Sequence, residues 1–101
     1  MDNIDRETWN KFRRHCLSQQ QLNPESTIPD TIRKLLFLEK GGIDLNCFTK
    51  EDIYNYFAIR LENGATYTAL NHSIKALNRW NKFKDNGLKF QRYKTSKKEK
   101  R

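Results

Sequence analysis

Residues 66–85 read TYTALNHSIKALNRWNKFKD, and this stretch decides the fold of the 101-residue chain. Its apolar and small side chains recur every three or four positions, which is the spacing of one face of an α-helix. Projected at about 100° per residue, one half of the helix carries Leu70, Ser73, Ile74, Ala76, Leu77, Trp80 and Phe83. We therefore expect a long amphipathic helix whose aromatic residues pack in the core rather than stack on a ligand.

Three shorter helices are expected before this one, because the same periodicity recurs and no stretch alternates in the manner of a strand. They are expected over about residues 5–20, 27–40 and 49–63. Thr27 and Thr49 are suited to cap the second and third helices, and Asp52 completes a capping box with Thr49. The sequence thus predicts an all-α fold, a compact four-helix orthogonal bundle.

The positive charge of the chain is confined to its C-terminal part. Residues 1–64 carry nine Lys/Arg and ten Asp/Glu, whereas residues 65–101 carry eleven Lys/Arg and two acids, so the formal net charge of +8 divides into −1 and +9. A basic surface gains free energy by releasing the counterions that condense on nucleic acid. This asymmetry predicts a polyanionic partner.

The last residues, 89–101, read KFQRYKTSKKEKR and contain few apolar side chains. Such a composition buries too little surface to offset the entropy of ordering the chain. We therefore expect residues 1–88 to form a helical domain, and residues 89–101 to form a flexible basic tail or an interdomain linker.

The polar half of the long helix is basic and rich in amides, and no acid interrupts residues 65–84. Lysine, arginine, asparagine and histidine are side chains that reach phosphates and base edges in the major groove of double-stranded DNA. The expected DNA contacts on this helix are Thr68, Asn71, His72, Lys75, Asn78, Arg79 and Lys82. Two alternatives remain open: a helical protein–protein interaction module with an acidic partner, and an RNA-binding regulator.

Catalytic, metal and cofactor sites are not expected. Cys16 and Cys47 lack the spacing of a metal site and are both expected to be buried, while His15 and His72 lack partners for a catalytic dyad or triad. No apolar run approaches the roughly 18 residues of a membrane span, and the N-terminus does not resemble a signal peptide. A cytoplasmic protein without a membrane or small-molecule partner is therefore expected.

Residues 5–90 resemble the N-terminal core-binding (SAM-like) domain of tyrosine recombinases, the phage-type integrases. The segment Ile43-Asp44-Leu45, followed by residues 48–53 (FTKEDI) and Tyr56, is similar to the pattern that opens the third helix in that family. The family's fourth helix has an asparagine followed by an apolar–x–Ala–Leu–x–x–aromatic run, which is similar to Asn71, Ile74, Ala76, Leu77 and Trp80.

This resemblance implies that the second and fourth helices face double-stranded DNA and that the basic tail leads toward a catalytic domain. Further contacts would come from Thr27, Thr31 and Lys34 on the second helix and from Lys89 and Arg92 on the tail. The family's catalytic Arg, Lys, His-x-x-Arg and Tyr lie in a separate domain, and neither histidine here is followed by arginine at the third position. The resemblance therefore implies a non-catalytic targeting module for DNA integration, with a catalytic domain or other recombinase protomers as partners.

Overall fold

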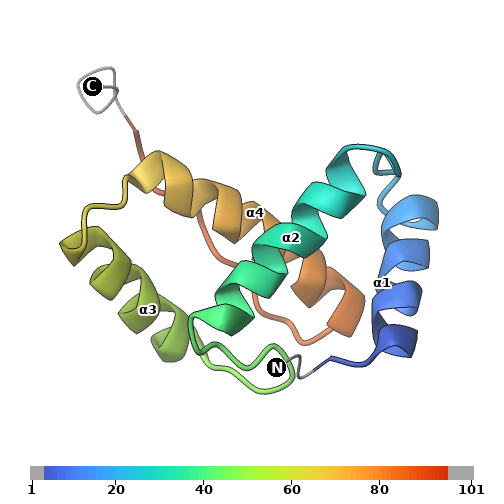
Figure 1. Cartoon of the computed structure of the whole chain (residues 1–101), viewed down its shortest axis with the longest axis horizontal. Helices are drawn as coiled ribbons and strands as arrows, with labels where there is room; N and C mark the ends of the chain where they lie inside the picture. Colours follow the sequence, from blue (N-terminus) through green and yellow to red (C-terminus); the bar gives the residue numbers. More distant parts are fainter. Residues whose placement is uncertain (1–3, 96–101) are drawn as a thin grey trace.

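The computed structural model describes residues 4–95, which form four α-helices and contain no strand (Figure 1). The helices are α1 (Arg6–Ser18), α2 (Thr27–Lys40), α3 (Lys50–Glu62) and α4 (Tyr67–Lys84). The prediction of an all-α fold is confirmed, and the helix limits lie within two residues of those expected from the sequence.

Local hydrogen bonds explain where α3 and α4 begin. The Thr49 hydroxyl accepts a hydrogen bond from the Asp52 amide, and the Asp52 carboxylate accepts one from the Thr49 amide, so the predicted capping box is present. At α4, the Thr66 hydroxyl accepts a hydrogen bond from the Ala69 amide at 3.1 Å. These bonds satisfy amide groups that have no partner inside the helix.

The start of α2 differs from the prediction. Its N-cap is Ser26, which makes no side-chain capping bond, and Thr27 is the first helical residue rather than the cap. The Asn23 side chain instead accepts hydrogen bonds from the amides of Glu25 and Ser26, which shapes the turn before the helix. The Thr27 hydroxyl is therefore not used for capping.

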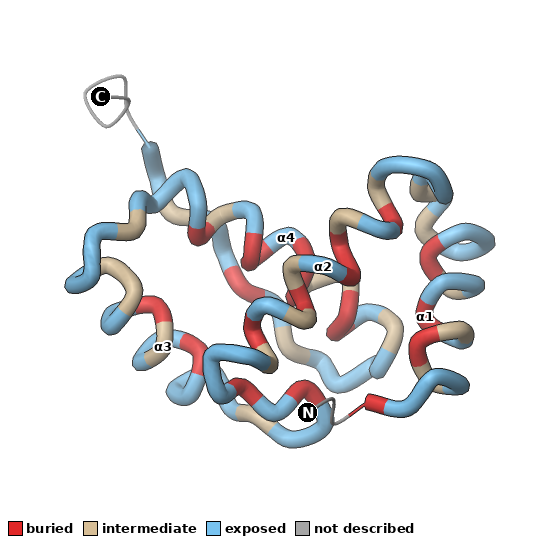
Figure 2. Tube along the Cα trace, viewed as in Figure 1, coloured by how far each residue is buried: buried red, intermediate tan, exposed pale blue. Residues whose placement is uncertain are grey.

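The core lies where α1 and α2 pack against α4, and Figure 2 shows their buried positions facing inward. Trp80 of α4 is fully buried, its ring centre lies 5.4 Å from that of Trp9 and 5.2 Å from that of Phe12, and its indole N–H donates to the Leu45 carbonyl. Phe83 is half-buried against the same cluster. The predicted core role of both α4 aromatics is confirmed.

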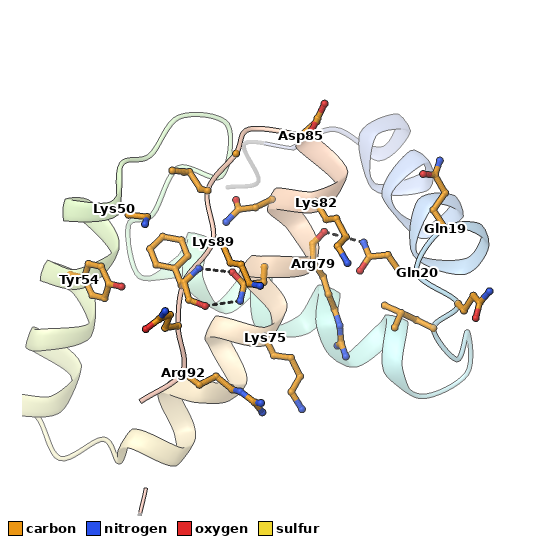
Figure 3. A pocket seen from close by; sticks show the side chains of 18 residues that line it. Gln19, Gln20, Lys50, Tyr54, Lys75, Arg79, Lys82, Asp85, Lys89 and Arg92 are labelled. Atoms are coloured by element: carbon orange, nitrogen blue, oxygen red, sulfur yellow. Dashed lines mark hydrogen bonds between the residues drawn. The ribbon is translucent and has the colours of Figure 1, made fainter. Parts of the chain in front are cut away.

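After α4, an extended segment of residues 88–93 runs back between α4 and α3 (Figure 3). We call this segment the strap. Its Phe90 is 1% exposed and packs against the ring of Tyr54 on α3. Its Tyr93 packs against the ring of Tyr67 on α4, with 5.0 Å between the ring centres.

The strap corrects the predicted domain boundary. The sequence placed the end of the packed domain at residue 88, whereas the structure extends it to Tyr93, because Phe90 and Tyr93 fill the space between two helices. Of the remaining predicted tail, Lys94 and Thr95 are exposed, and residues 96–101 lie outside the described residues.

Candidate nucleic-acid interface

Lys75, Arg79 and Lys82 lie along the outward face of α4. Lys75 and Lys82 are exposed and Arg79 is half-buried, in agreement with the helical projection. Within residues 4–95, no carboxylate lies within ion-pair distance of these three side chains. The ion pairs in this part of the chain join Glu7 to Lys11 and Asp30 to both Arg33 and Lys34.

An open groove of about 1320 Å³, which we call the basic groove, lies on one side of the row formed by Lys75, Arg79 and Lys82. It is formed by α4, the strap, the α1–α2 loop and the start of α3 (Figure 3). Its cationic residues are Lys50, Lys75, Arg79, Lys82, Lys89 and Arg92. Among residues 4–95, Asp85 is the one acidic residue of its lining, and Figure 3 places it at the opposite end from Lys75 and Arg92. The basic groove therefore concentrates charge of one sign.

On the other side of the row lies a smaller groove, of about 540 Å³, between α2 and α4. The structure brings together here the predicted residues Thr27, Thr31, Lys34, His72, Lys75 and Arg79. Asp30 also lines this groove and accepts two hydrogen bonds from Lys34 Nζ, at 3.0 and 3.1 Å. That hydrogen bonding holds the pKa of the Asp30 carboxyl below its ordinary value, so the charge of Lys34 is offset within the chain.

Thr31 does not face solvent, which corrects its expected role as a DNA contact. It is 1% exposed, and its hydroxyl donates to the Thr27 carbonyl at 2.8 Å and accepts from Arg79 Nη1 at 2.7 Å. The backbone carbonyl of Arg79 also accepts a hydrogen bond from Gln20 Nε2 at 3.2 Å. Thr31 therefore orients the Arg79 guanidinium, which makes no other hydrogen bond within residues 4–95.

Asn71 and Asn78 are also placed differently from the prediction, because their amides bind the strap. Asn78 donates to the Phe90 carbonyl and accepts from the Phe90 amide, each at 2.8 Å. Asn71 makes the same pair of bonds with Tyr93, at 3.0 and 2.7 Å. Since both ends of each side-chain amide are occupied, neither is available for the expected two-bond contact with adenine.

The remaining predicted residues are accessible. Thr68 and His72 are exposed on α4, and His72 lines the smaller groove while Thr68 lines neither groove. Lys89 and Arg92 are exposed on the strap and both line the basic groove. The basic groove therefore contains the predicted cations of α4 together with Lys89 and Arg92 of the predicted tail.

Lys50 was not predicted as a site residue. It lies in the half of the sequence whose charges balance, and it reaches the basic groove because α3 packs on the strap, where its ammonium lies 6.0 Å from the centre of the Phe90 ring. The exposed side chains of Gln19 and Gln21 also line this groove, from a loop in which Gln21 has φ of 54°. Only the three-dimensional packing, and no sequence motif, brings these residues to α4.

The cysteines differ from each other, although both were expected to be buried. Cys16 is buried in the core, and this burial raises the pKa of its thiol to about 11. Cys47 is exposed, in the turn between α2 and α3. Over residues 4–95, no helix is both long and apolar enough to cross a membrane, and no cluster of metal-ligating side chains occurs.

Comparison with known proteins adds no relative. A scan against protein-family models gave no match, and searches of curated proteins and of solved structures gave no significant similarity.

Proposed function

We propose that this chain binds double-stranded DNA through the outward face of α4 and the basic groove beside it. The observation that carries the proposal is the set of six cationic side chains from α3, α4 and the strap that line one groove with a single acid. Such a surface gains affinity by displacing counterions from phosphates. Because Lys75, Arg79 and Lys82 make no ion pair with any residue of 4–95, that part of the chain leaves their charges for a ligand.

The shape of this surface favours duplex DNA over the alternatives. Lys75 and Lys82 are exposed on the outward face of α4, and an α-helix fits the major groove of B-form DNA, which is about 12 Å wide. The major groove of A-form RNA is too deep and narrow for side chains to read. The other cations of the basic groove, Lys50, Lys89 and Arg92, lie beside α4, where they would contact the phosphates that border the major groove of the DNA.

The proposal extends to the setting that the sequence motifs imply. By resemblance to core-binding domains, the chain would be the non-catalytic targeting module of a tyrosine recombinase that acts in DNA integration. A catalytic domain and other recombinase protomers would then be its protein partners. The all-helical fold is compatible with that setting and the resemblance of the motifs is its support.

Salt-dependent binding to a random-sequence DNA duplex tests the proposal. About five phosphate contacts predict a slope of roughly −4 to −5 in a plot of log affinity against log salt concentration. The double substitution K75Q/K82Q removes two exposed cations and should reduce the slope by about 1.8 and the affinity at about 0.1 M salt by about 60-fold. Arg79 is left in place because its guanidinium donates to the buried Thr31 hydroxyl, so its substitution would remove a contact between α4 and α2 together with the charge.

The matched control is R14Q/K40Q, which removes two exposed cations that line neither groove. The control should bind the duplex as the parent chain does. A parent slope near −1, or equal losses in the two double variants, would contradict the proposal. Competition with an RNA duplex of equal length separates the RNA-binding alternative, and absence of any duplex binding would favour the protein-interaction module.

A further inference from the structure

The side chains of Asn71 and Asn78 hold the strap along α4 much as a neighbouring strand would. Each amide donates to and accepts from the backbone of one strap residue, so four hydrogen bonds of 2.7–3.0 Å join the two segments. The pairing is Asn78 with Phe90 and Asn71 with Tyr93, so the strap runs antiparallel to α4. These bonds satisfy backbone groups that strands obtain from a sheet.

The spacing of the two asparagines matches the spacing of the strap residues that they hold. Seven helical residues rise by about 10.5 Å and return to nearly the same face of the helix. Three extended residues, from Phe90 to Tyr93, span about 10 Å. The two anchors therefore fix the strap at one register along α4, and a slip by one residue would break both pairs of bonds.

This register determines which strap side chains face solvent. Phe90 is buried and Tyr93 is half-buried, whereas Lys89, Gln91 and Arg92 are exposed. Lys89 and Arg92 line the basic groove together with the cations of α4, and Figure 3 shows Arg92 beside Lys75. The anchors thus place charges from the strap next to charges from the helix.

We infer that Asn71 and Asn78 are positioning residues of the DNA interface, which hold Lys89 and Arg92 at a fixed place beside Lys75 and Lys82. The inference rests on the proposed function and deepens it, because it makes the strap a working part of the DNA-binding surface. In this role the amides act through the two strap cations and make no base contact themselves.

A double-mutant cycle tests this coupling. In the parent chain, K89Q/R92Q should lower duplex affinity at about 0.1 M salt by about 60-fold and the salt slope by about 1.8. In the N71A/N78A background the same pair of substitutions should cost at most a few fold, because unanchored cations no longer meet phosphates at fixed positions. The substitution K75Q/K82Q is the control, and its cost should be equal in both backgrounds.

Tryptic cleavage after Lys89 and Arg92, measured without DNA, reports the release of the strap independently of binding. N71A/N78A should be cleaved faster than the parent chain. Should the double variant fail to fold by circular dichroism, N71A alone removes the outer anchor. In that background the cost of R92Q should be lost and the cost of K89Q retained.

The outcomes separate the two proposals. If the parent chain does not bind the duplex, the proposed function fails and this inference fails with it, whatever the cleavage rates. If the parent binds and the costs of N71A/N78A and K89Q/R92Q add independently, only the positioning role is overturned. Tighter binding by N71A/N78A would also overturn it, because the strap would then cover the interface instead of completing it.

Discussion

Replacing Phe90 with alanine is the most direct test of whether the strap belongs to the folded domain. Phe90 is 1% exposed, its ring packs against Tyr54 of α3, and its backbone is hydrogen-bonded to Asn78 of α4. Truncation of a buried phenylalanine typically lowers the free energy of unfolding by about 3–5 kcal/mol. Because the site adjoins the basic groove and is able to relax, we expect a loss near the lower end, about 3 kcal/mol.

This loss is large for a domain of this size, whose total stability is about 5–14 kcal/mol at 0.05–0.15 kcal/mol per residue. At about 4–8 °C per kcal/mol, F90A should lower the melting temperature by about 12–24 °C. Unfolding is to be followed by far-ultraviolet circular dichroism, with urea titration as a second measurement. The control Q91A removes an exposed neighbour in the strap and should change stability by less than about 0.5 kcal/mol.

Equal melting temperatures for F90A, Q91A and the parent chain would refute the packing argument. Residues 89–93 would then behave as the unpacked tail that their composition suggests. A loss of melting temperature without loss of helical signal at low temperature would locate the effect in packing and not in helix formation.

Two further outcomes are expected. The substitution Asp30→Asn removes the ion-pair partner of Lys34 and Arg33. Duplex affinity should therefore rise, and the salt slope should steepen by about 0.9–1.8. Weaker binding would argue against a DNA role for the smaller groove. Folding lowers the pKa of the Asp30 carboxyl, so its carboxylate stabilises the fold fully above the ordinary pKa of 3.8. This stabilisation is lost progressively as the pH falls through the lower pKa of the folded state. The free energies of unfolding of the parent chain and of D30N should therefore converge only in that acid range. With a thiol reagent at neutral pH, the exposed Cys47 should react quickly and the buried Cys16 only on unfolding, because burial raises the pKa of the Cys16 thiol to about 11. Two rapidly reacting thiols in the folded protein would contradict the buried position of Cys16.

The sequence predicts the helical part of the fold well, because the signals that determine it are local. The Thr49–Asp52 capping box lies within one turn, and the buried face of α4 follows from helical periodicity alone. The partners of Trp80 in the core are aromatic residues on another periodic face, so its burial also follows from the pattern.

The candidate site is predicted less completely, because part of it depends on contacts between distant segments. Phe90 is an isolated aromatic residue in a basic stretch, and only its pairing with Asn78 and its place beside Tyr54 make it a core residue. An asparagine on a basic helix is equally suited to contact a DNA base or to bind the backbone of the protein itself. The sequence pattern does not distinguish these two roles. Lys50 joins the site only through the packing of α3.

The position of Arg79 has a consequence for the thermodynamics of binding. Its carbonyl is bonded to Gln20 and its guanidinium to Thr31, so this one residue of α4 is joined to the α1–α2 loop and to α2. An arginine that is already immobilised avoids a rotamer-entropy loss of about 0.5–1.5 kcal/mol on association. Calorimetry of duplex binding should accordingly find a smaller entropic penalty for engaging Arg79 than for engaging the exposed Lys75 and Lys82.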